Sequence, residues 1–204
     1  MLAFGITHIK ETAMKKSLGA GTLAQPTPAW LVGTYDADGK PNVMTIAWGG
    51  ICSSAPPCVA VCVRPGRHTF PAITARQGFT VNIPSQNLAR ETDYVGMVSG
   101  AAADKFAVAG LTATKSALVD APIVNECPLV LECRLIKTID LGAHTQFVGE
   151  ILDVKADESV LAPDGHVDPL RLQPLVYAPG DGKYYGLGEV VGKAFGIGKE
   201  LMGK

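Results

Sequence analysis

The chain has 204 residues, of which 47% are hydrophobic and 18% charged, and its formal net charge at pH 7 is -1. This length suits one globular domain with a full core, and the lack of a basic excess argues against nucleic acid as a partner. The low charged fraction predicts a buried subunit interface or an apolar ligand cleft.

The N-terminus has no early positive charge, no long apolar stretch and no small-residue cleavage pattern, so it does not resemble a secretory signal. No apolar run reaches the length of a membrane span. We therefore expect a cytoplasmic protein with no membrane partner. Met14-Lys15-Lys16 resembles a natural start. This makes residues 1–16 a leader, which is unstructured or precedes an alternative start, and residues 17–204 a single domain.

Strands dominate the pattern and follow one another at short intervals. They are predicted over residues 29–35, 43–48, 58–63, 79–83, 129–141 and 145–155. A turn cluster over residues 36–41, with Asp-Gly inside it, joins the first two strands into a hairpin. The third strand is continuously apolar, so it should be buried on both faces. Without a βαβ succession, this order predicts a mainly β, antiparallel Greek-key barrel rather than a Rossmann sheet.

Two short helices and three loops complete the predicted elements. One helix covers residues 68–76, with Thr69 as its cap, and the other covers residues 85–94, with Ser85 as its cap. Loops are predicted over residues 95–106, 163–175 and 184–198. In the last of these, glycine stands at nearly every third position, which argues against a stable helix.

The cysteines and histidines show no framework for a disulfide or a metal. The five cysteines are odd in number and contain no Cys-x-x-Cys pair. We interpret them as reduced core thiols, and Cys58 and Cys62, which share strand parity, should point to one face. The four histidines are scattered without ligand spacing, so no metal site is predicted.

The strongest local candidate for a ligand site is the segment from Arg64 to Thr69. It places two arginines, Arg64 and Arg67, then His68 and the Thr69 hydroxyl at the start of a predicted helix. Arginine forks match phosphate oxygens, and a helix start offers free N–H groups. The segment therefore predicts a site for a single phosphate. The alternative is a solvated basic loop with an ordinary threonine cap, and the two readings are about equally supported.

Weaker signals stand elsewhere in the chain. Strand alternation puts Asn42 and Trp48 on one face, where they could line a flat aromatic ligand, although a core tryptophan and a turn asparagine explain them equally simply. Pro84 ends a strand, which leaves backbone groups free nearby. Lys105 in a loop of small residues could reach an anion, and His144 lies in a turn between two strands. Alone, each of the last two is more often a solvated residue.

Several blocks, in their order and spacing, carry a specific resemblance: PAWLVGTYDADGKPNVMTIAWGG, PPCVAVCVRPGRHTF, GFTVNIPS, GMVSGAAADKF with GLT, and LECRL…FVGEIL. They extend from about Ser17 to about Gly198 and resemble the flavin reductase-like family, in particular its flavoredoxins. The resemblance implies an FMN-binding split β-barrel with a few short helices. It also implies a homodimer, with the flavin near the subunit interface.

By this resemblance, Thr69 and an adjacent arginine would hold the FMN phosphate. The flavin would lie along Asn42, Trp48 and the backbone from Asn82 to Ser85. Lys105 would lie near the flavin or its phosphate. No residue is expected to act as a catalytic acid or base. The cofactor-binding residues expected are Asn42, Thr45, Trp48, Arg64, Arg67, His68, Thr69, Asn82, Ile83, Ser85, Lys105, His144 and Tyr177.

Three functions stay open at this point. The protein could pass electrons through bound FMN between protein partners, such as a ferredoxin-like protein or a reductase. It could instead be an NAD(P)H-dependent flavin reductase that supplies reduced flavin. A third reading is a non-catalytic flavin- or haem-binding module, in which His144 would be the candidate axial ligand. The resemblance favours the electron carrier. Because the flavin reductase alternative would be an enzyme, the sequence leaves open whether the chain is one.

Overall fold

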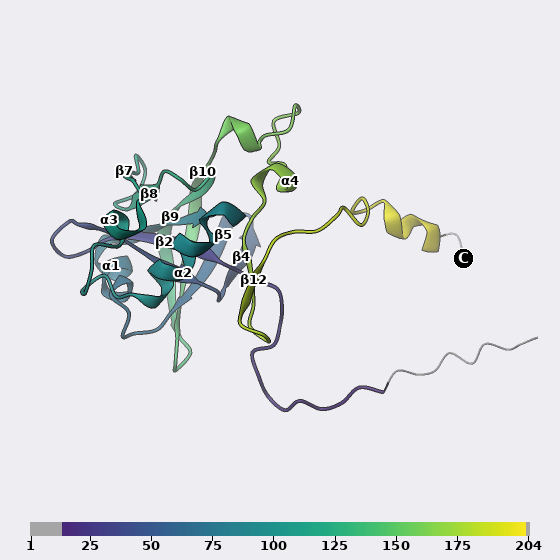
Figure 1. Ribbon diagram of the computed structural model, residues 1–204, viewed down its shortest axis with the longest axis horizontal. Coiled ribbons are helices and arrows are strands. Elements are labelled where there is room, and N and C mark those ends of the chain that lie inside the picture. The colour runs from purple at the N-terminus through teal and green to yellow at the C-terminus, as the bar shows by residue number, and fades with distance from the viewer. Residues whose placement is uncertain (1–13, 203–204) are drawn as a thin grey trace, which may run out of the picture.

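The computed structural model describes residues 14–202. The mainly β, antiparallel split barrel expected from the sequence is confirmed, with short helices packed against it (Figure 1). The predicted leader, residues 1–16, lies largely outside the described residues. The longest helix in the described part has nine residues, whereas a bilayer crossing takes about 20.

The main sheet has seven strands in the order β3-β2-β6-β9-β10-β5-β4, and every neighbouring pair is antiparallel. β2 pairs with β6, and β10 with β5, so neighbours in space are separated in sequence, as in a Greek key. The strands are β2 (Trp30–Tyr35), β3 (Pro41–Ile46), β4 (Gly49–Ser54), β5 (Pro57–Val63), β6 (Gly78–Ile83), β9 (Leu129–Asp140) and β10 (Thr145–Ala156).

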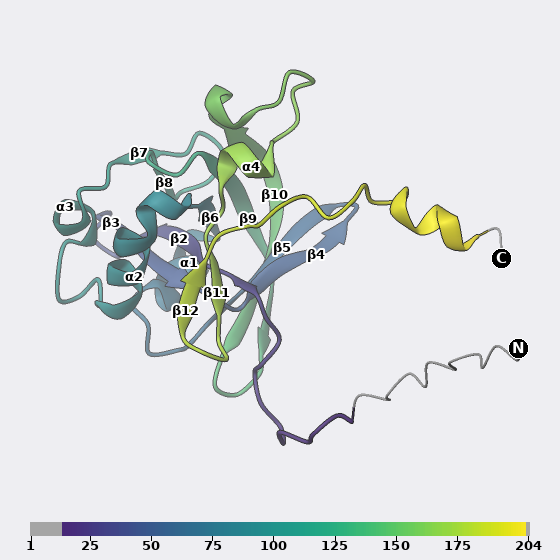
Figure 2. The same ribbon diagram turned by 45° about the vertical axis from the view of Figure 1, so that its right-hand side comes forward.

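Smaller elements surround this sheet. One three-stranded sheet combines β1 (Thr27–Pro28), β11 (Val176–Ala178) and β12 (Lys183–Tyr185), and β7 (Ala113–Lys115) pairs with β8 (Pro122–Val124). The helices are α1 (Thr69–Arg76), α2 (Ala89–Met97), α3 (Lys105–Ala109) and α4 (Pro169–Leu172), with 3-10 turns at Gln86–Leu88, Glu158–Val160 and Ile197–Leu201. Figure 2 shows α2 and α3 on the side of the sheet that carries β2 and β3.

Strand alternation divides the core into two clusters. Val32 of β2 packs inside the barrel, while its neighbour Leu31 faces the opposite cluster with α2 and α3. The barrel interior includes Phe79 and Phe147, both fully buried. Fully burying a side chain of this size contributes roughly 1.5–3 kcal/mol. The segment after β3 rejoins the sheet, because the Cys62 N–H donates to the Trp48 carbonyl at 2.8 Å.

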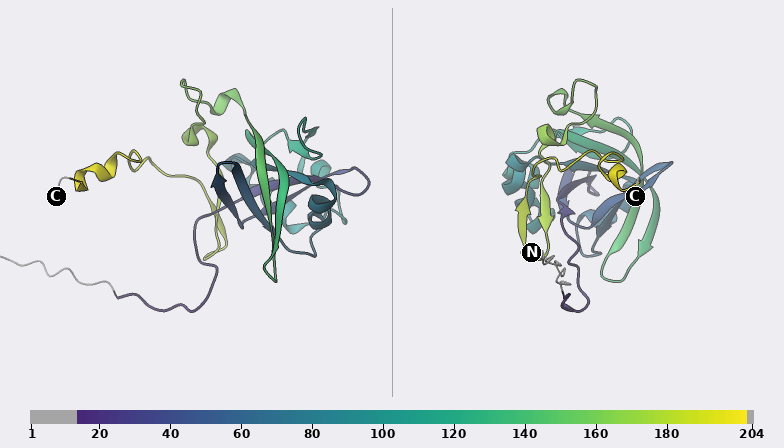
Figure 3. Two further views of the ribbon diagram at one scale, coloured as in Figure 1. Left: turned by 180° about the vertical axis from the view of Figure 1, so that it is seen from behind. Right: turned by 90° about the vertical axis from the view of Figure 1, so that its right-hand side faces the viewer.

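Both ends of the described chain project from the barrel, as seen from behind in Figure 3. The C-terminal arm, residues 186–202, is exposed along almost its whole length. Its backbone hydrogen bonds are local, running between residues 193 and 202. Exposed apolar side chains follow one another along it, including Val191 at 92% and Phe195 at 98% exposure.

Several local predictions need correction. Strand β4 was not predicted, and residues 95–106 are not one loop, since α2 extends to Met97 and α3 begins at Lys105. Neither predicted cap is formed. The Thr69 hydroxyl accepts a hydrogen bond from Asn42 instead of capping α1, and the Ser85 hydroxyl donates to the Leu172 carbonyl. Long-range partners outcompete the local caps in both cases.

Candidate functional site

A small basic pocket lies where β3, the start of α1 and the loop before α3 meet. It has a volume of about 60 Å³, and its lining includes Arg67, His68, Thr69, Ser99, Gly100 and Lys105. None of the described residues that line it is acidic. Arg67 and Lys105 give its lining a positive charge. The pocket is therefore suited to an anion.

Lys105 is the most unusual group in the basic pocket. Its side chain is 4% exposed, and its Nζ donates to the carbonyls of Val43 and Val95, each at 2.8 Å. An ammonium has three donors, so one is left for a ligand. Burial, and then the nearby charge of Arg67, lower the pKa of Lys105 to about 8. A bound anion would stabilise the charged ammonium and so offset both the burial of Lys105 and the repulsion from Arg67.

A second group of contacts fixes the basic pocket in shape. The Arg67 guanidinium donates to the Gly96 carbonyl of α2 at 2.6 Å. The buried Asn42 amide donates to the Thr69 hydroxyl at 2.8 Å, while its own oxygen has no partner among the described residues. Gly100 lies against both Asn42 and His68, and a Cβ there would come within 2.2 Å of the Asn42 oxygen. Only glycine therefore fits this wall without displacing the polar groups.

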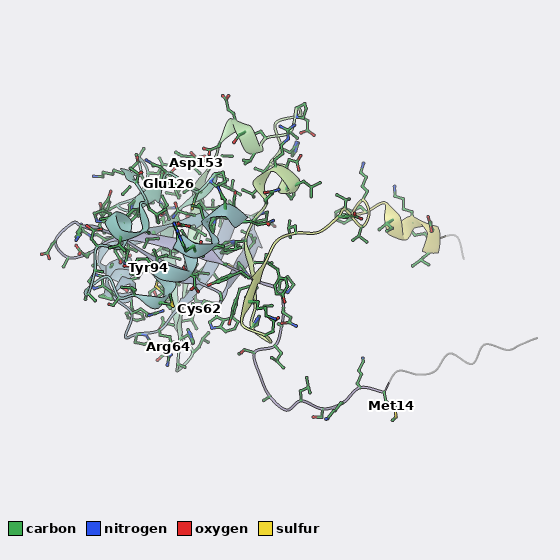
Figure 4. All side chains as sticks on the ribbon, in the orientation of Figure 1. Met14, Cys62, Arg64, Tyr94, Glu126 and Asp153 are labelled. Atoms are coloured by element: carbon green, nitrogen blue, oxygen red, sulfur yellow. The ribbon has the colours of Figure 1, made fainter. Side chains whose placement is uncertain are left out.

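The strand-end pocket continues from the basic pocket along the end of β3. Its volume is about 160 Å³, and it is lined by residues 44–48 with Cys62, Arg64, Arg67 and His144. Arg64 and Arg67 also border an open hollow of about 620 Å³ beside the turn between β9 and β10. Figure 4 labels Cys62 and Arg64, which lie near one another at the end of β5. Burial raises the pKa of the Cys62 thiol, which keeps it protonated near neutral pH.

The tyrosine pocket lies beyond Thr45 and Ala47, which also line the strand-end pocket. It has a volume of about 300 Å³, and its walls include Asp93, Gly96, Tyr177 and Tyr184. The Thr45 hydroxyl donates to the Thr92 carbonyl, which ties β3 to α2 between the pockets.

The structure brings together most of the expected site residues but not all. Around the three connected pockets it assembles Thr45, Trp48, Arg64, Arg67, His68, Thr69, Lys105, His144 and Tyr177. Asn42 lies directly behind Thr69 and supports it.

Three expected residues do not line these pockets. The Asn82 side chain is fully buried, donating to Leu31 and Thr80 and accepting from the Val124 N–H. Ile83 belongs to the barrel core. Ser85 is bound to the α4 segment.

Sequence reasoning missed Cys62 and Gly100 in the basic and strand-end pockets, and Asp93 in the tyrosine pocket. Cys62 was interpreted as a core thiol, yet it lies one residue before the end of β5 and two before Arg64, a position that could have suggested the pocket. Gly100 stood in a segment interpreted as a plain small-residue loop. For Asp93, which is separated by 84 residues from the other wall at Tyr177, the sequence offered no signal.

The comparisons with known proteins agree with this architecture. Residues 23–188 match the flavin reductase like domain family. Flavoredoxin of Desulfovibrio vulgaris (Miyazaki F) superposes with a TM-score of 0.87 at 51% identity, over 91% of this chain and 100% of that one. Flavoredoxin from Methanosarcina acetivorans also gives 0.87, at 31% identity, over 93% and 100%.

A third relative, an uncharacterized protein of Archaeoglobus fulgidus, is 38% identical over 115 residues, which are 56% of this chain and 65% of that protein. The family match covers most of the described chain and includes all three pockets. The chain therefore belongs to the flavin reductase-like family.

Proposed function

We propose that this protein binds FMN and uses it to transfer electrons. The observation that carries the proposal is the basic pocket, where Arg67 and the buried Lys105 converge without an acidic side chain in the lining. A single phosphate is a small dianion that arginine forks and helix starts hold well. The two flavoredoxins among the similar structures support the same reading.

The residues present fit such a group. The unpaired oxygen of the buried Asn42, the wall at Gly100 that excludes a Cβ, and the spare donor of Lys105 surround a space of phosphate size. Arg67, Thr69 and Lys105 would hold the phosphate. Thr45, Trp48 and the strand-end pocket would hold the ring.

Bound FMN would supply reversible uptake of electrons. The chain contributes binding, orientation and charge. Arg64 and Arg67 line the strand-end pocket, so their guanidinium groups favour negative charge on whatever occupies it. The neutral thiol of Cys62 and the indole of Trp48 form the less polar part of the lining, which limits access of water.

Titration with FMN tests the proposal directly. Purified protein is expected to be yellow or to take up one FMN per chain, as followed by absorbance and by quenching of flavin fluorescence. A Lys105→Met variant is expected to bind at least tenfold more weakly, because it removes a charge-assisted contact of about 1.5–3 kcal/mol. Lys115→Met, at an exposed position of β7, serves as the control. A colourless protein that takes up no FMN would contradict the proposal.

The electron donor separates the two redox functions. We favour an electron carrier, so bound FMN should be reduced rapidly by reduced ferredoxin in anaerobic stopped-flow absorbance. Fast bleaching by NADH or NADPH would instead identify an NAD(P)H-dependent flavin reductase. A preparation with a Soret band would support the haem-binding alternative.

We also propose that the protein is a homodimer, as the low charged fraction and the exposed C-terminal arm suggest. Light scattering should give about twice the chain mass of 21.3 kDa. A double variant, Val191→Asp with Phe195→Asp, should shift the protein toward the monomer, whereas Val108→Asp, at an exposed site of α3, should not. A monomeric wild-type protein would refute this proposal.

A further inference from the structure

The tyrosine pocket is separate from the basic pocket and differs from it in charge. It is built from β3, α2 and the small sheet that contains β11 and β12, and only Thr45 and Ala47 connect it to the strand-end pocket. Its volume of about 300 Å³ is at the lower end of the range for small-molecule sites. It can therefore hold a ligand of one or two rings.

Two aromatic rings form one side of this pocket. The ring centroids of Tyr177 and Tyr184 are 5.7 Å apart, and their planes are inclined by 52°. The Tyr184 hydroxyl donates to Oδ1 of Asp93 at 3.0 Å. Burial, and then this contact, raise the pKa of Tyr184 to about 12, so the hydroxyl stays a donor near neutral pH. The Tyr184 hydroxyl therefore holds the Asp93 carboxylate beside the two rings.

Asp93 is the one charged side chain among the described residues that line the tyrosine pocket. It is half-buried, and within residues 14–202 its carboxylate is engaged by the Tyr184 hydroxyl rather than by a cation. A partly desolvated carboxylate gains from an opposite charge brought next to it. Tyrosine faces also attract cations within about 6 Å. Both features select for positive charge and against anions.

We propose that the tyrosine pocket binds a small planar aromatic cation of the pyridinium or quinolinium type, with its charge toward Asp93 and its ring beside Tyr177 and Tyr184. Binding of the cation goes beyond the proposed function and does not depend on it. Only the placement of this pocket next to a flavin rests on the proposed function.

Isothermal titration calorimetry on the full chain, with and without FMN, tests the site. The probes are 1-methylquinolinium and, as an anion of matched size, 2-naphthoate. We expect the cation to bind at least tenfold more tightly than the anion, both with and without FMN. Asp93→Asn should weaken the cation about tenfold, the loss expected for a partly buried charge contact of about 1.4 kcal/mol, and should leave FMN affinity unchanged.

Matched variants separate the pocket from general electrostatics. Asp181→Asn removes the same charge from the exposed β11–β12 turn, where Asp181 pairs with Lys183, and should leave cation binding unchanged. Tyr184→Leu removes one aromatic face and should weaken the cation severalfold, which gives a second test if Asp93→Asn does not fold.

Equal affinity for the anion, no loss in Asp93→Asn, or an equal loss in Asp181→Asn would overturn the inference. Competition between the cation and FMN, or weaker FMN binding by Asp93→Asn, would also overturn it, because the pocket would then be part of the flavin site. Failure to bind FMN with cation binding intact would contradict only the proposed function.

Discussion

The lowered pKa of Lys105 predicts that FMN affinity falls as the pH rises through about 8. In the ligand-free protein, burial and Arg67 lower this pKa from 10.5 to about 8, so the protonated fraction drops from about nine-tenths at pH 7 to about one-tenth at pH 9. A bound phosphate would stabilise the ammonium and return its pKa toward the ordinary value. The charged form is then the binding form, and affinity is lost above the ligand-free pKa.

The size of the effect follows from this linkage. If bound FMN restores the ordinary pKa, the dissociation constant should rise about tenfold between pH 7 and pH 9, approaching a slope of one per pH unit. The phosphate itself does not change this, because its second pKa is about 6 and it stays a dianion over the range.

Fluorescence titrations at pH 7, 8 and 9 measure the dissociation constant directly. Riboflavin, which lacks the phosphate, is the matched ligand and should show a much flatter profile. The Lys105→Met variant should lose the pH dependence along with the affinity. An FMN dissociation constant that is flat from pH 7 to pH 9, or an equal slope with riboflavin, would refute the role assigned to Lys105.

Two further predictions concern the packing around the site and the barrel. Gly100→Ala should weaken FMN binding and destabilise the protein by about 1–3 kcal/mol, because the new Cβ meets the Asn42 oxygen. Gly50→Ala in β4, where a Cβ has open space, is the control for titration and chemical denaturation. Glu132 is fully buried and, although burial alone would raise its pKa, a hydrogen bond from Lys155 helps to lower it overall. The ionised Glu132 therefore stabilises the fold at pH values above the usual carboxyl pKa, and this stabilisation is lost as the pH falls through the lowered pKa of Glu132. The stability of Glu132→Gln should consequently depend less on pH in acid than that of the wild type. Equal acid profiles would contradict this.

The sequence by itself determined six of the seven strands of the main sheet, their antiparallel character and the basic segment from Arg64 to Thr69. Apolar runs and turn residues are local signals, and the hairpin of β2 and β3 and the long β9–β10 pair follow from them. The resemblance then identified the family, and most of the site residues that it implied line one of the three pockets. Local signals failed where a partner distant in sequence decided the outcome, as for the Thr69 hydroxyl, which pairs with Asn42 rather than capping its helix.

Only the tertiary structure decided which side chains meet. Lys105 is an ordinary lysine in the sequence, and it acquires a lowered pKa because α3 places its ammonium under β3 and α2, next to Arg67. The resemblance implies that the backbone from Asn82 to Ser85 lies along the flavin, whereas in the fold Asn82 pairs with both β2 and β9 and the Pro84 carbonyl accepts from the Leu175 N–H. Asp93 and Tyr184 are 91 residues apart and form one wall. Burial and charge at such points depend on long-range packing, which no short stretch of sequence encodes.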